Sequence, residues 1–509
     1  MNADNLSIRA TQKEWWGLVV LALTCMLYSM DLTVLNLAVP QLSRALNPSP
    51  SQLLWIVDIY GFFLAGSLIT MGTLGDRIGR RKMLLVGGAV FATVSAVAAF
   101  STSAEMLIVL RTLQGMAGAT LAPSTLSLIR VLFRNPKQRS VAIGLWGTSF
   151  SVGGLIGPLV GGLLIENYWW GSVFLINVPV MLLMIVLGPI LLPEFKDPNA
   201  GKLDLTSAGL SLFAILLVVL GLKSVAEHGL QLLPIIYLGL GLLLAFVFIQ
   251  RQKKLKDPLM DLKLFNNAKF NSLMATNFFT MFVIFGTFIF TAQYMQLVMG
   301  LSPLRAGLWS MTFSTGFIIS SLLSPAIARF VKPAYVMASG LILGSIGFLM
   351  MSQVNGVSDI VMLGFGTFLF SFGSSPVLLF TTGMLINSAP SEKAGSAAAL
   401  SETSNELGGA LGIAVLGSLG TFLYQRKLSQ SAATSGDSQL QTAFQGTLEN
   451  AISYVEKLPS DISSSLIKVV HIAYIESFEI VMLISCLVLV TLSGLVVSRL
   501  RDVKLEDEA

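Results

Sequence analysis

The sequence predicts an all-α polytopic membrane protein with fourteen transmembrane helices, and three observations support this fold class. Of the 509 residues, 54% are hydrophobic and only 12% are charged, which is about half the charged fraction of a typical soluble domain. Apolar runs of about 20 residues, long enough to cross a bilayer as helices, recur along the chain. Because these runs are nearly continuous and do not alternate with a period of two, a transmembrane β-barrel is excluded.

Polar breaks between the apolar runs give the order of the spans. Eight spans precede a cytoplasmic stretch at 251–270, and six follow it. The thirteenth span contains several polar residues, so that hydropathy alone could miss it. The spans are expected near 16–38, 52–72, 83–101, 104–127, 139–163, 171–193, 206–224, 230–250, 271–297, 304–328, 333–353, 358–382, 396–424 and 473–498.

The basic residues predict the orientation of these spans. The formal net charge is +5, and most of the 32 Lys and Arg residues fall in the loops on one side of the membrane. By the positive-inside rule that side is the cytoplasm and, with an even number of spans, both termini lie there. No small-residue cleavage site follows the first apolar run, so we expect an uncleaved first span in the plasma membrane. The basic balance therefore reflects topology, and no nucleic-acid partner is expected.

The sequence contains no recognisable enzyme site. Cys25 and Cys486 lie in apolar runs at opposite ends of the chain, and the only histidines, His228 and His471, lie near span ends. These residues form neither a disulfide framework nor a metal-ligand set. A Walker A loop and a Gly-x-Ser-x-Gly elbow are both absent from the sequence. We therefore expect no metal, no cofactor and no ATP-driven step.

The segment 425–472 is expected to be a long outer loop. It is rich in Ser, Gln and Ala, and apolar residues recur in it every four positions, at Leu440, Phe444, Leu448 and Ile452. This spacing predicts an amphipathic helix. The helix could lie passively on the surface of the protein, or it could act as a gating element.

The loop after the second span has an unusual composition. A short basic cytoplasmic loop would explain its arginines but not its glycines and aspartate. Glycines allow a tight turn and a close helix approach, and an aspartate beside arginines can form a charge network that breaks and re-forms. We expect a conformational switch formed by Gly72, Asp76, Arg77, Gly79, Arg80 and Arg81. The complete string is Gly72-Thr-Leu-Gly75-Asp76-Arg77-Ile-Gly79-Arg80-Arg81-Lys82.

The fifth span contains a second glycine-rich string, Gly153-Gly154-Leu-Ile-Gly157-Pro158-Leu-Val-Gly161-Gly162. Small residues four apart let helices pack closely, and a proline weakens the backbone hydrogen bonds of its helix. Glycines at this spacing occur in many membrane helices, but the Gly-Pro and Gly-Gly context is more specific. We expect a hinge formed by Gly153, Gly157, Pro158, Gly161 and Gly162.

These strings resemble the conserved motifs of the major facilitator superfamily, as does Arg111-Thr-Leu-Gln-Gly115-Met-Ala-Gly118 in the fourth span. Within that superfamily the chain is similar to the fourteen-span drug:proton antiporters, which include exporters of quaternary ammonium compounds. The strings that carry the closer likeness are Met30-Asp31-Leu-Thr-Val-Leu-Asn-Leu-Ala-Val-Pro40, Leu54-Trp55-Ile-Val-Asp58-Ile-Tyr60, Phe174-Leu-Ile-Asn177-Val-Pro179, Pro258-Leu-Met-Asp261-Leu-Lys-Leu-Phe265, Leu301-Ser-Pro303-Leu-Arg-Ala-Gly307 and Glu402-Thr-Ser-Asn-Glu406-Leu-Gly-Gly.

The resemblance covers nearly the whole chain and implies the major facilitator fold, two six-helix bundles with two extra spans between them. The expected domains are an N-terminal bundle at 1–200, the inserted spans and the start of a linker at 201–255, and a C-terminal bundle at 256–509. One position departs from the family pattern. Relatives that export dications carry an acidic residue in the tenth span, where this chain has Gly316. That departure argues against divalent substrates.

Charged residues inside the spans are the candidates for transport chemistry, because each costs roughly 2.5–3.5 kcal/mol to insert. Asp31 lies deep in the first span among apolar neighbours, and Arg111 is the one candidate cation. Asp58 and Glu479 lie nearer the outer ends of their spans and could simply be solvated. The resemblance implies a role for Arg111 in proton coupling, although it could also merely brace the bundle.

Glu402 and Glu406 are four residues apart and therefore lie on one face of a helix. Two carboxylates in a medium of low dielectric repel each other, so at least one is expected to hold a proton near neutral pH. Such a group can exchange its proton for a cation, although the pair could also be polar residues at the cytoplasmic end of the span. We assign proton coupling to Asp31, Glu406 and Arg111, and substrate binding to Glu402 and Asp58.

Aromatic residues near these charges could stack on lipophilic cations, or they could simply pack between helices. The candidates are Trp55, Tyr60, Trp146 and Phe150. The sequence therefore predicts a monomeric antiporter that exports lipophilic, mainly cationic drugs, antiseptics or dyes by alternating access, driven by the proton motive force. An exporter of an endogenous metabolite, peptide or lipid is the alternative on the same fold. A non-transporting membrane sensor or enzyme is a third reading, which no motif supports.

Overall fold

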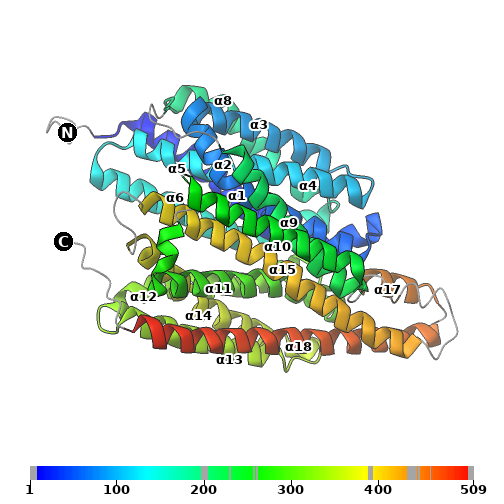
Figure 1. Ribbon diagram of the computed structural model, residues 1–509. Helices are drawn as coiled ribbons and strands as arrows, with labels where there is room; N and C mark the ends of the chain where they lie inside the picture. Colours follow the sequence, from blue (N-terminus) through cyan, green and yellow to red (C-terminus); the bar gives the residue numbers. More distant parts are fainter. Residues whose placement is uncertain are drawn as a thin grey trace.

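A computed structural model of the protein describes residues 9–196, 204–228, 231–255, 258, 262–387, 394–432, 444, 448–458 and 460–501. Helices account for nearly all of the residues in these ranges, as Figure 1 shows. Capping residues in the sequence fix where several helices begin. Thr11 and Glu14 form a capping box at the start of the first helix, and Ser49 and Gln52 form another at the start of the second.

The helices of the first half of the chain are α1 (Gln12–Leu46), α2 (Pro50–Ile78), α3 (Arg80–Ala98), α4 (Ala104–Gly118), α5 (Leu121–Leu132), α6 (Pro136–Asn167), α7 (Ser172–Leu175), α8 (Asn177–Leu191), α9 (Leu205–His228) and α10 (Leu232–Lys254). Those of the second half are η2 (Leu262–Asn266), α11 (Ala268–Gln293), η3 (Tyr294–Val298), α12 (Pro303–Ala328), α13 (Pro333–Met351), η4 (Val357–Asp359), α14 (Ile360–Asn387), α15 (Ala394–Ala432), α17 (Leu448–Val455) and α18 (Ser460–Leu500).

The number of membrane-spanning helices is confirmed only in part. Within the described residues, 12 helices are long and apolar enough to cross a membrane, and 13 if α1, which bends by 42° near Asp31, counts as one span. The predicted fourth span is divided between α4, with 15 residues, and α5, with 12 residues. Neither part is long enough to be counted alone, so fourteen spans remain a prediction.

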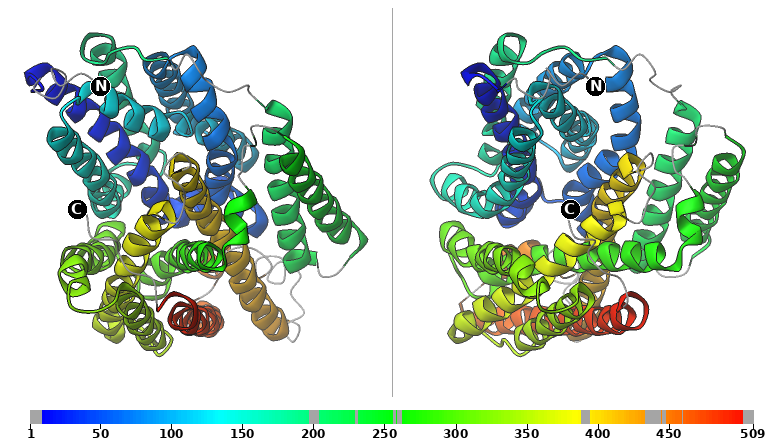
Figure 2. Two further views of the ribbon diagram at one scale, coloured as in Figure 1. Left: turned by 60° about the vertical axis from the view of Figure 1, so that its left-hand side comes forward. Right: turned by 90° about the vertical axis from the view of Figure 1, so that its left-hand side faces the viewer.

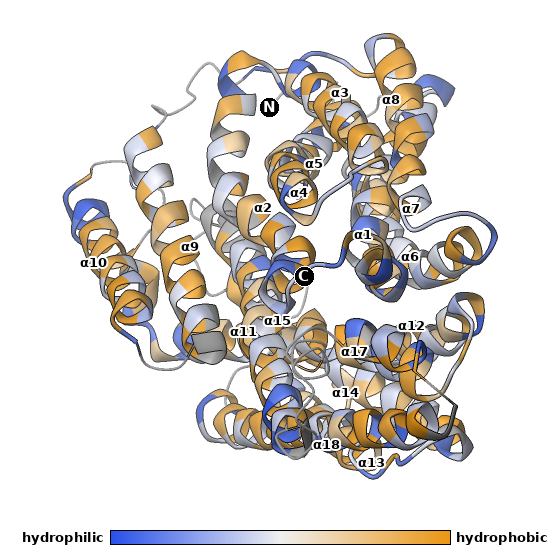
Figure 3. Ribbon diagram, turned by 90° about the vertical axis from the view of Figure 1, so that its right-hand side faces the viewer, coloured by the Kyte–Doolittle hydropathy of each residue, from blue (hydrophilic) through white to orange (hydrophobic). Residues whose placement is uncertain are grey.

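Two groups of helices lie side by side, with a helical hairpin at one edge (Figure 2). Helices α1 to α8 pack with one another, and helices α11 to α15 pack with one another and with α18. The hairpin of α9 and α10 lies at one edge, where α9 contacts both α2 and α15. The outer surface of α10 is apolar, with Leu232, Leu242 and Phe246 all exposed (Figure 3). Such a surface is suited to lipid.

The two bundles are in close contact at one end of the molecule. A Cβ atom on Gly162 of α6 would lie 2.6 Å from the carbonyl oxygen of Pro303, and one on Gly307 of α12 would lie 2.3 Å from that of Pro158. The Glu166 carboxylate also accepts a hydrogen bond from the Leu304 amide at 3.0 Å. Glycine is required at both crossing points, because a side chain there would separate α6 from α12.

The segment 425–472 is more helical than expected. Helix α15 continues to Ala432 and α18 begins at Ser460, so both helices extend into the predicted outer segment. The predicted amphipathic helix is present as α17, in which Leu448 and Ile452 are buried. Phe444 is also buried, whereas Leu440 lies outside the described residues. Helix α17 contacts both α1 and α18, and therefore touches both bundles.

Candidate functional site

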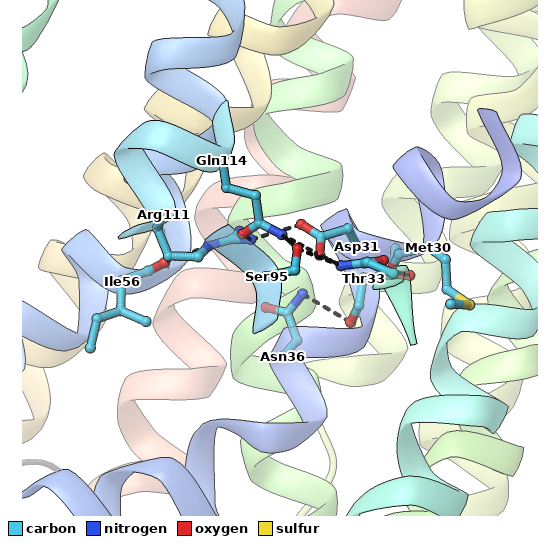
Figure 4. Close-up of polar contacts among 9 residues, drawn as sticks. Met30, Asp31, Thr33, Asn36, Ile56, Ser95, Arg111 and Gln114 are labelled. Atoms are coloured by element: carbon cyan, nitrogen blue, oxygen red, sulfur yellow. Dashed lines mark hydrogen bonds and ion pairs between the residues drawn. The ribbon is translucent and has the colours of Figure 1, made fainter. Parts of the chain in front are cut away.

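The deepest charged group of the first bundle is an ion pair between α1 and α4. Arg111 Nη1 donates to Asp31 Oδ2 at 2.7 Å, and the two side chains are only 2% and 1% exposed (Figure 4). Taking two charges out of water is costly unless further hydrogen bonds satisfy the remaining polar atoms. The sequence predicted both residues as buried charges, and the structure brings them together across 80 positions of the chain.

Neutral polar side chains complete the hydrogen bonding of this pair. Asp31 Oδ1 accepts from Asn177 Nδ2 at 2.9 Å and from Gln114 Nε2 at 3.2 Å. Gln114 Oε1 accepts from Arg111 Nη1 at 2.9 Å, and Gln114 Nε2 also donates to Ser95 Oγ at 3.0 Å. Helices α1, α3, α4 and α8 thus all contribute to holding one carboxylate. No role is expected from the sequence for Asn177, Gln114 or Ser95, since neutral polar residues carry no strong insertion cost.

Aromatic rings enclose the guanidinium group. Arg111 Cζ lies 4.4 Å from the centre of the Tyr60 ring and 5.9 Å from that of Phe174. Both contacts are within the range of cation–π attraction. Tyr60 was predicted to bind substrate, but in this structure its ring is fully buried against Arg111. In this conformation Tyr60 stabilises the buried charge pair, and its surface is not open to a substrate.

A hydrogen bond between Tyr28 and Glu406 joins the two bundles. The Tyr28 hydroxyl of α1 donates to Glu406 Oε1 of α15 at 2.8 Å. The Tyr28 ring meets Phe150 edge to face at 5.8 Å, and Phe150 meets Trp146 in the same way at 4.9 Å. Two of the predicted aromatic residues, Trp146 and Phe150, therefore lie beside the Tyr28–Glu406 contact. Tyr28 itself had no sequence signal, because an aromatic residue in an apolar run is ordinary.

The remaining predicted carboxylates have different surroundings. Asp58 of α2 is fully buried, so the structure excludes the reading in which it is solvated at the outer end of its span. Trp55, one turn earlier, packs edge to face on Phe62 at 6.3 Å, within a cluster that also includes residues of α9 and α15. The side chain of Glu402 lies outside the described residues, and its predicted pairing with Glu406 is not tested.

The predicted switch loop forms a tight joint between α2 and α3. Gly79 has φ 115°, a backbone conformation that favours glycine. On one side of it, Arg80 Nε donates to Asp76 Oδ1 at 2.7 Å. On the other side, the Glu194 carboxylate accepts from the backbone amides of Arg81 at 3.0 Å and Lys82 at 3.2 Å. A carboxylate at this place satisfies the free amides at the start of α3 and complements its dipole.

Other members of the predicted switch make fewer contacts. Arg77 is exposed, and Gly72 faces Pro123, whose Cβ would be 3.8 Å from a Cβ on the glycine. The Arg81 side chain donates from Nη1 to the carbonyl oxygen of Leu192 at 2.9 Å. Sequence reasoning missed Glu194, which follows the sixth span and lies 113 residues from Arg81.

The glycine string of α6 is a packing surface. A Cβ atom on Gly153, Gly157 or Gly161 would lie 2.2–2.4 Å from atoms of α1, and Gly162 meets α12 instead. The helix is continuous through Pro158 from Pro136 to Asn167. The structure therefore gives these residues close contacts with two neighbouring helices, and their predicted role as a hinge stays a prediction.

The tenth span has no space for an acidic side chain at the position where dication exporters carry one. A Cβ on Gly316 would lie 2.3 Å from Ser371 Oγ and 2.6 Å from the carbonyl oxygen of Phe368. Within the described parts of the chain, no group of three or more His, Cys, Asp or Glu residues is placed to hold a metal ion.

Comparison with known proteins connects this geometry to a family. The family model described as Major Facilitator Superfamily matches residues 21–413. The multidrug efflux pump LfrA of Mycolicibacterium smegmatis is 39% identical over 83% of this chain and 84% of its own length. The methyl viologen resistance protein SmvA of Salmonella typhimurium is 32% identical over 92% and 94%, respectively. The tetracenomycin C resistance and export protein of Streptomyces glaucescens is 32% identical over 80% and 76%.

Two solved structures share the fold at low sequence identity. A bacterial homologue of the human lysosomal transporter Spinster has a TM-score of 0.66 at 15% identity, covering 96% of this chain and 99% of that one. A peptide transporter in complex with sulfate has a TM-score of 0.61 at 16% identity, covering 94% of both chains. These likenesses support the arrangement of helices and carry no information about substrate.

Proposed function

This chain belongs to the major facilitator superfamily, and we propose that it is a proton-coupled antiporter that exports lipophilic, mainly cationic drugs by alternating access. The names of its relatives, which are multidrug efflux pumps and drug resistance proteins, support the cargo class. The buried pair of Asp31 and Arg111 is the observation that carries the coupling. Lipophilic monocations, including quaternary ammonium compounds, are the expected substrates, because Gly316 leaves no acidic group in the tenth span.

The proposed topology has fourteen spans in the plasma membrane with both termini in the cytoplasm. We count α1 as one bent span and the pair α4 and α5 as one broken span. In support, the start of α1 and the end of α18 lie on the same side of the molecule, and α17 lies on the other (Figure 1). The proposed domains are the bundle at 1–200, the inserted hairpin at 201–255 and the bundle at 256–509, and the chain acts as a monomer.

The conformation of the protein fits an inward-facing state. The bundles meet through Gly162 and Gly307 near the end of α6 and the start of α12, which the proposed topology places on the outer side. Helix α17, on that same side, contacts both bundles and would support the closed outer side. A drug would therefore enter from the cytoplasm, and the bundles would have to separate at Gly162 and Gly307 before it is released.

Proton exchange at Asp31 follows from its surroundings. As a carboxylate it accepts hydrogen bonds from Arg111, Gln114 and Asn177, so that both of its oxygens have donors in this conformation. A proton can therefore bind only when some of these donors move away. Rearrangement of the bundle between the two states of the cycle would supply that movement, so that proton binding and conformational change become linked.

Inverted membrane vesicles provide the direct test. The vesicles are energised with an imposed proton gradient, and uptake is followed for one monocationic dye and one neutral lipophilic dye. We expect gradient-driven uptake of the monocation, accompanied by proton release that depends on the dye. If a well-folded protein transports neither dye but does export an endogenous metabolite, peptide or lipid, the cargo assignment is wrong. Dye uptake that does not depend on the proton gradient would instead contradict the proposed proton coupling.

A further inference from the structure

Only one end of the Asn177 side-chain amide forms hydrogen bonds. Asn177 is the first residue of α8 and is 1% exposed. Its Nδ2 donates to Asp31 Oδ1 at 2.9 Å and to Ser95 Oγ at 3.4 Å. Within the described part of the chain, its Oδ1 is buried and accepts no hydrogen bond. A buried acceptor without a partner is costly, so its retention beside a buried carboxylate calls for an explanation.

If Asp31 binds a proton, its new O–H group requires a hydrogen-bond acceptor, and Asn177 Oδ1 can be that acceptor. An ionised carboxylate only accepts hydrogen bonds, whereas a protonated carboxyl group also has an O–H to donate. Gln114 is held in its present orientation, because its Oε1 accepts from Arg111 while its Nε2 donates to both Asp31 and Ser95, and turning its amide would break all three contacts. Ser95 Oγ already accepts from Gln114 and Asn177. The Asn177 oxygen is therefore the amide oxygen near Asp31 that is available to receive the new O–H.

A half-turn of the Asn177 side chain would bring this oxygen into position. The two ends of a carboxamide have nearly the same size, so the turn exchanges Oδ1 and Nδ2 without a change in packing. Oδ1 would then face Asp31 Oδ1, and it could also accept from the Ser95 hydroxyl. In either orientation one polar atom of the Asn177 amide lacks a hydrogen-bond partner. The turn therefore does not change the number of unpartnered polar atoms.

We propose that Asn177 is a positioning residue whose amide turns with the protonation state of Asp31, donating to the carboxylate and accepting from the carboxyl group. This inference rests on the proposed role of Asp31 as a proton site. Arg111 of α4 is the charged group in contact with Asp31, and Tyr60 of α2 lies against that guanidinium. From the other bundle, Glu406 of α15 reaches Tyr28, one turn before Asp31 on α1.

The competing explanation is that Asn177 is a fixed donor. In that case its loss would disfavour only the ionised form of Asp31, and the pH at which Asp31 binds a proton would rise. A turning amide serves both forms, so its loss removes one partner from each. The midpoint pH of protonation then stays near its original value. The two explanations thus predict different pH profiles for the same variant.

Infrared difference spectroscopy on the full-length protein in lipid vesicles can separate them. The C=O band of the protonated Asp31 is the band that Asp31→Asn removes, and it is followed as the pH is lowered. In Asn177→Leu we expect this band to move to higher frequency, because the carboxyl O–H has lost its acceptor. The midpoint pH should change by less than about half a unit, against a rise of about one unit or more for a fixed donor.

Gln114→Leu is the matched control, because it also removes a donor to Asp31 Oδ1 but no available acceptor. It should leave the frequency of the Asp31 band unchanged. If Asn177→Leu does not fold, the smaller Asn177→Ala takes its place. In the unsubstituted protein, asparagine labelled in its side-chain amide should show a band that changes at the same midpoint as the Asp31 band.

Each outcome is decisive. A shifted Asp31 band with an unmoved midpoint in Asn177→Leu supports the turning amide. An unshifted band, a midpoint that rises by a full unit, or an equal shift in Gln114→Leu overturns it while leaving Asp31 as the proton site. If Asp31→Asn removes no band, Asp31 does not titrate, and the proposed coupling falls together with the inference.

Discussion

The Tyr28 hydroxyl and the Glu406 carboxylate form a hydrogen bond of 2.8 Å that crosses from one helical bundle to the other. Tyr28 precedes Asp31 by three residues on α1, so the two side chains lie about one helical turn apart. The carboxylate of the first bundle and that of the second are thus connected through a single helix. Any movement of α1 against α15 must change the hydrogen bonding of Glu406, which is a physical route for coupling between the bundles.

Replacement of Tyr28 with Phe should weaken the coupling of transport to proton flux. The variant loses the hydroxyl group that donates to Glu406 across the two bundles, and a hydrogen bond to a charged group is worth about 1.5–3 kcal/mol. We expect the profile of dye-dependent proton flux against pH to lie below the parental profile. Tyr168→Phe is the control, because Tyr168 is exposed. An unchanged profile in Tyr28→Phe would show that the contact with Glu406 has no part in coupling.

Asp31→Asn should abolish the proton release that a drug induces in inverted vesicles. The substitution removes the proposed proton site, but it also leaves Arg111 without its counter-charge. Removing one partner of a buried ion pair costs about 3–5 kcal/mol, so folding must be checked by size-exclusion chromatography. The double variant Asp31→Asn, Arg111→Gln removes both charges and should fold better while remaining uncoupled. Glu105→Gln on the exposed part of α4 serves as the control.

Proton release at the parental rate in a well-folded Asp31→Asn variant would make Asp31 structural. The coupling function would then have to belong to the carboxylates of Asp58 and Glu406. Loss of release in Asp31→Asn but not in Glu105→Gln would support the assignment.

Asp76→Asn should reduce transport sharply while expression stays near normal. The carboxylate accepts from Arg80 Nε at 2.7 Å at the joint of α2 and α3, where Gly79 already fixes the turn. The fold does not depend on this partly exposed pair. The balance between the two states of the transport cycle is expected to depend on it. Dye uptake into vesicles is compared with that of Lys82→Gln, an exposed position in the same loop. Full uptake by a well-expressed Asp76→Asn would contradict the switch role.

The sequence located the helices well because apolar length is a direct consequence of crossing a bilayer. It was less informative where a helix leaves the membrane or breaks within it. Helix α18 begins at Ser460, well before the predicted 473–498, because its polar first turns carry no hydropathy signal. The division of the fourth span into α4 and α5 was likewise not foreseen, because hydropathy reports an apolar run and not its hydrogen bonding.

The candidate site shows the same limit. Asp31 and Arg111 were recognisable one by one, since a charge in an apolar run is rare. Their pairing depends on how α1 packs against α4, which a single sequence does not contain. The sequence gives no signal that Asn177 and Tyr28 belong to the site, because amides and aromatic rings are common in membrane helices. Their importance comes from the atoms they contact, Asp31 Oδ1 and Glu406 Oε1.

The two glutamates of α15 are expected to differ in function. By the proposed topology Glu406 lies one turn deeper than Glu402 and contacts Tyr28, so Glu406→Gln should impair proton coupling for every substrate. Glu402→Gln should chiefly weaken cationic substrates and spare neutral ones. The measurement is drug-dependent proton flux over a pH series with one monocationic and one neutral dye. If both variants transport both dyes with the parental pH profile, the pair is not the exchange site.

The glycines at which α6 crosses α12 should control whether the outer side can close. A Cβ at Gly307 would lie 2.3 Å from the Pro158 carbonyl oxygen, and one at Gly162 would lie 2.6 Å from that of Pro303. Backbone atoms cannot give way as a flexible side chain can, so Gly162→Ala and Gly307→Ala should hold the helices apart. We expect both variants to favour the outward-facing state and to transport slowly.

Gly147→Ala provides the matched control, because Gly147 is on the same helix and a Cβ there would meet nothing within 4 Å. Spin labels at Tyr168→Cys and Arg305→Cys, both exposed and close to the two ends in question, report the separation of α6 and α12. The native Cys25 and Cys486 are first replaced with alanine. The label distance should lengthen in Gly162→Ala and Gly307→Ala and stay parental in Gly147→Ala. Equal distances in all three variants would mean that close packing at this crossing does not hold the outer side shut, and the inward-facing assignment would lose its structural basis.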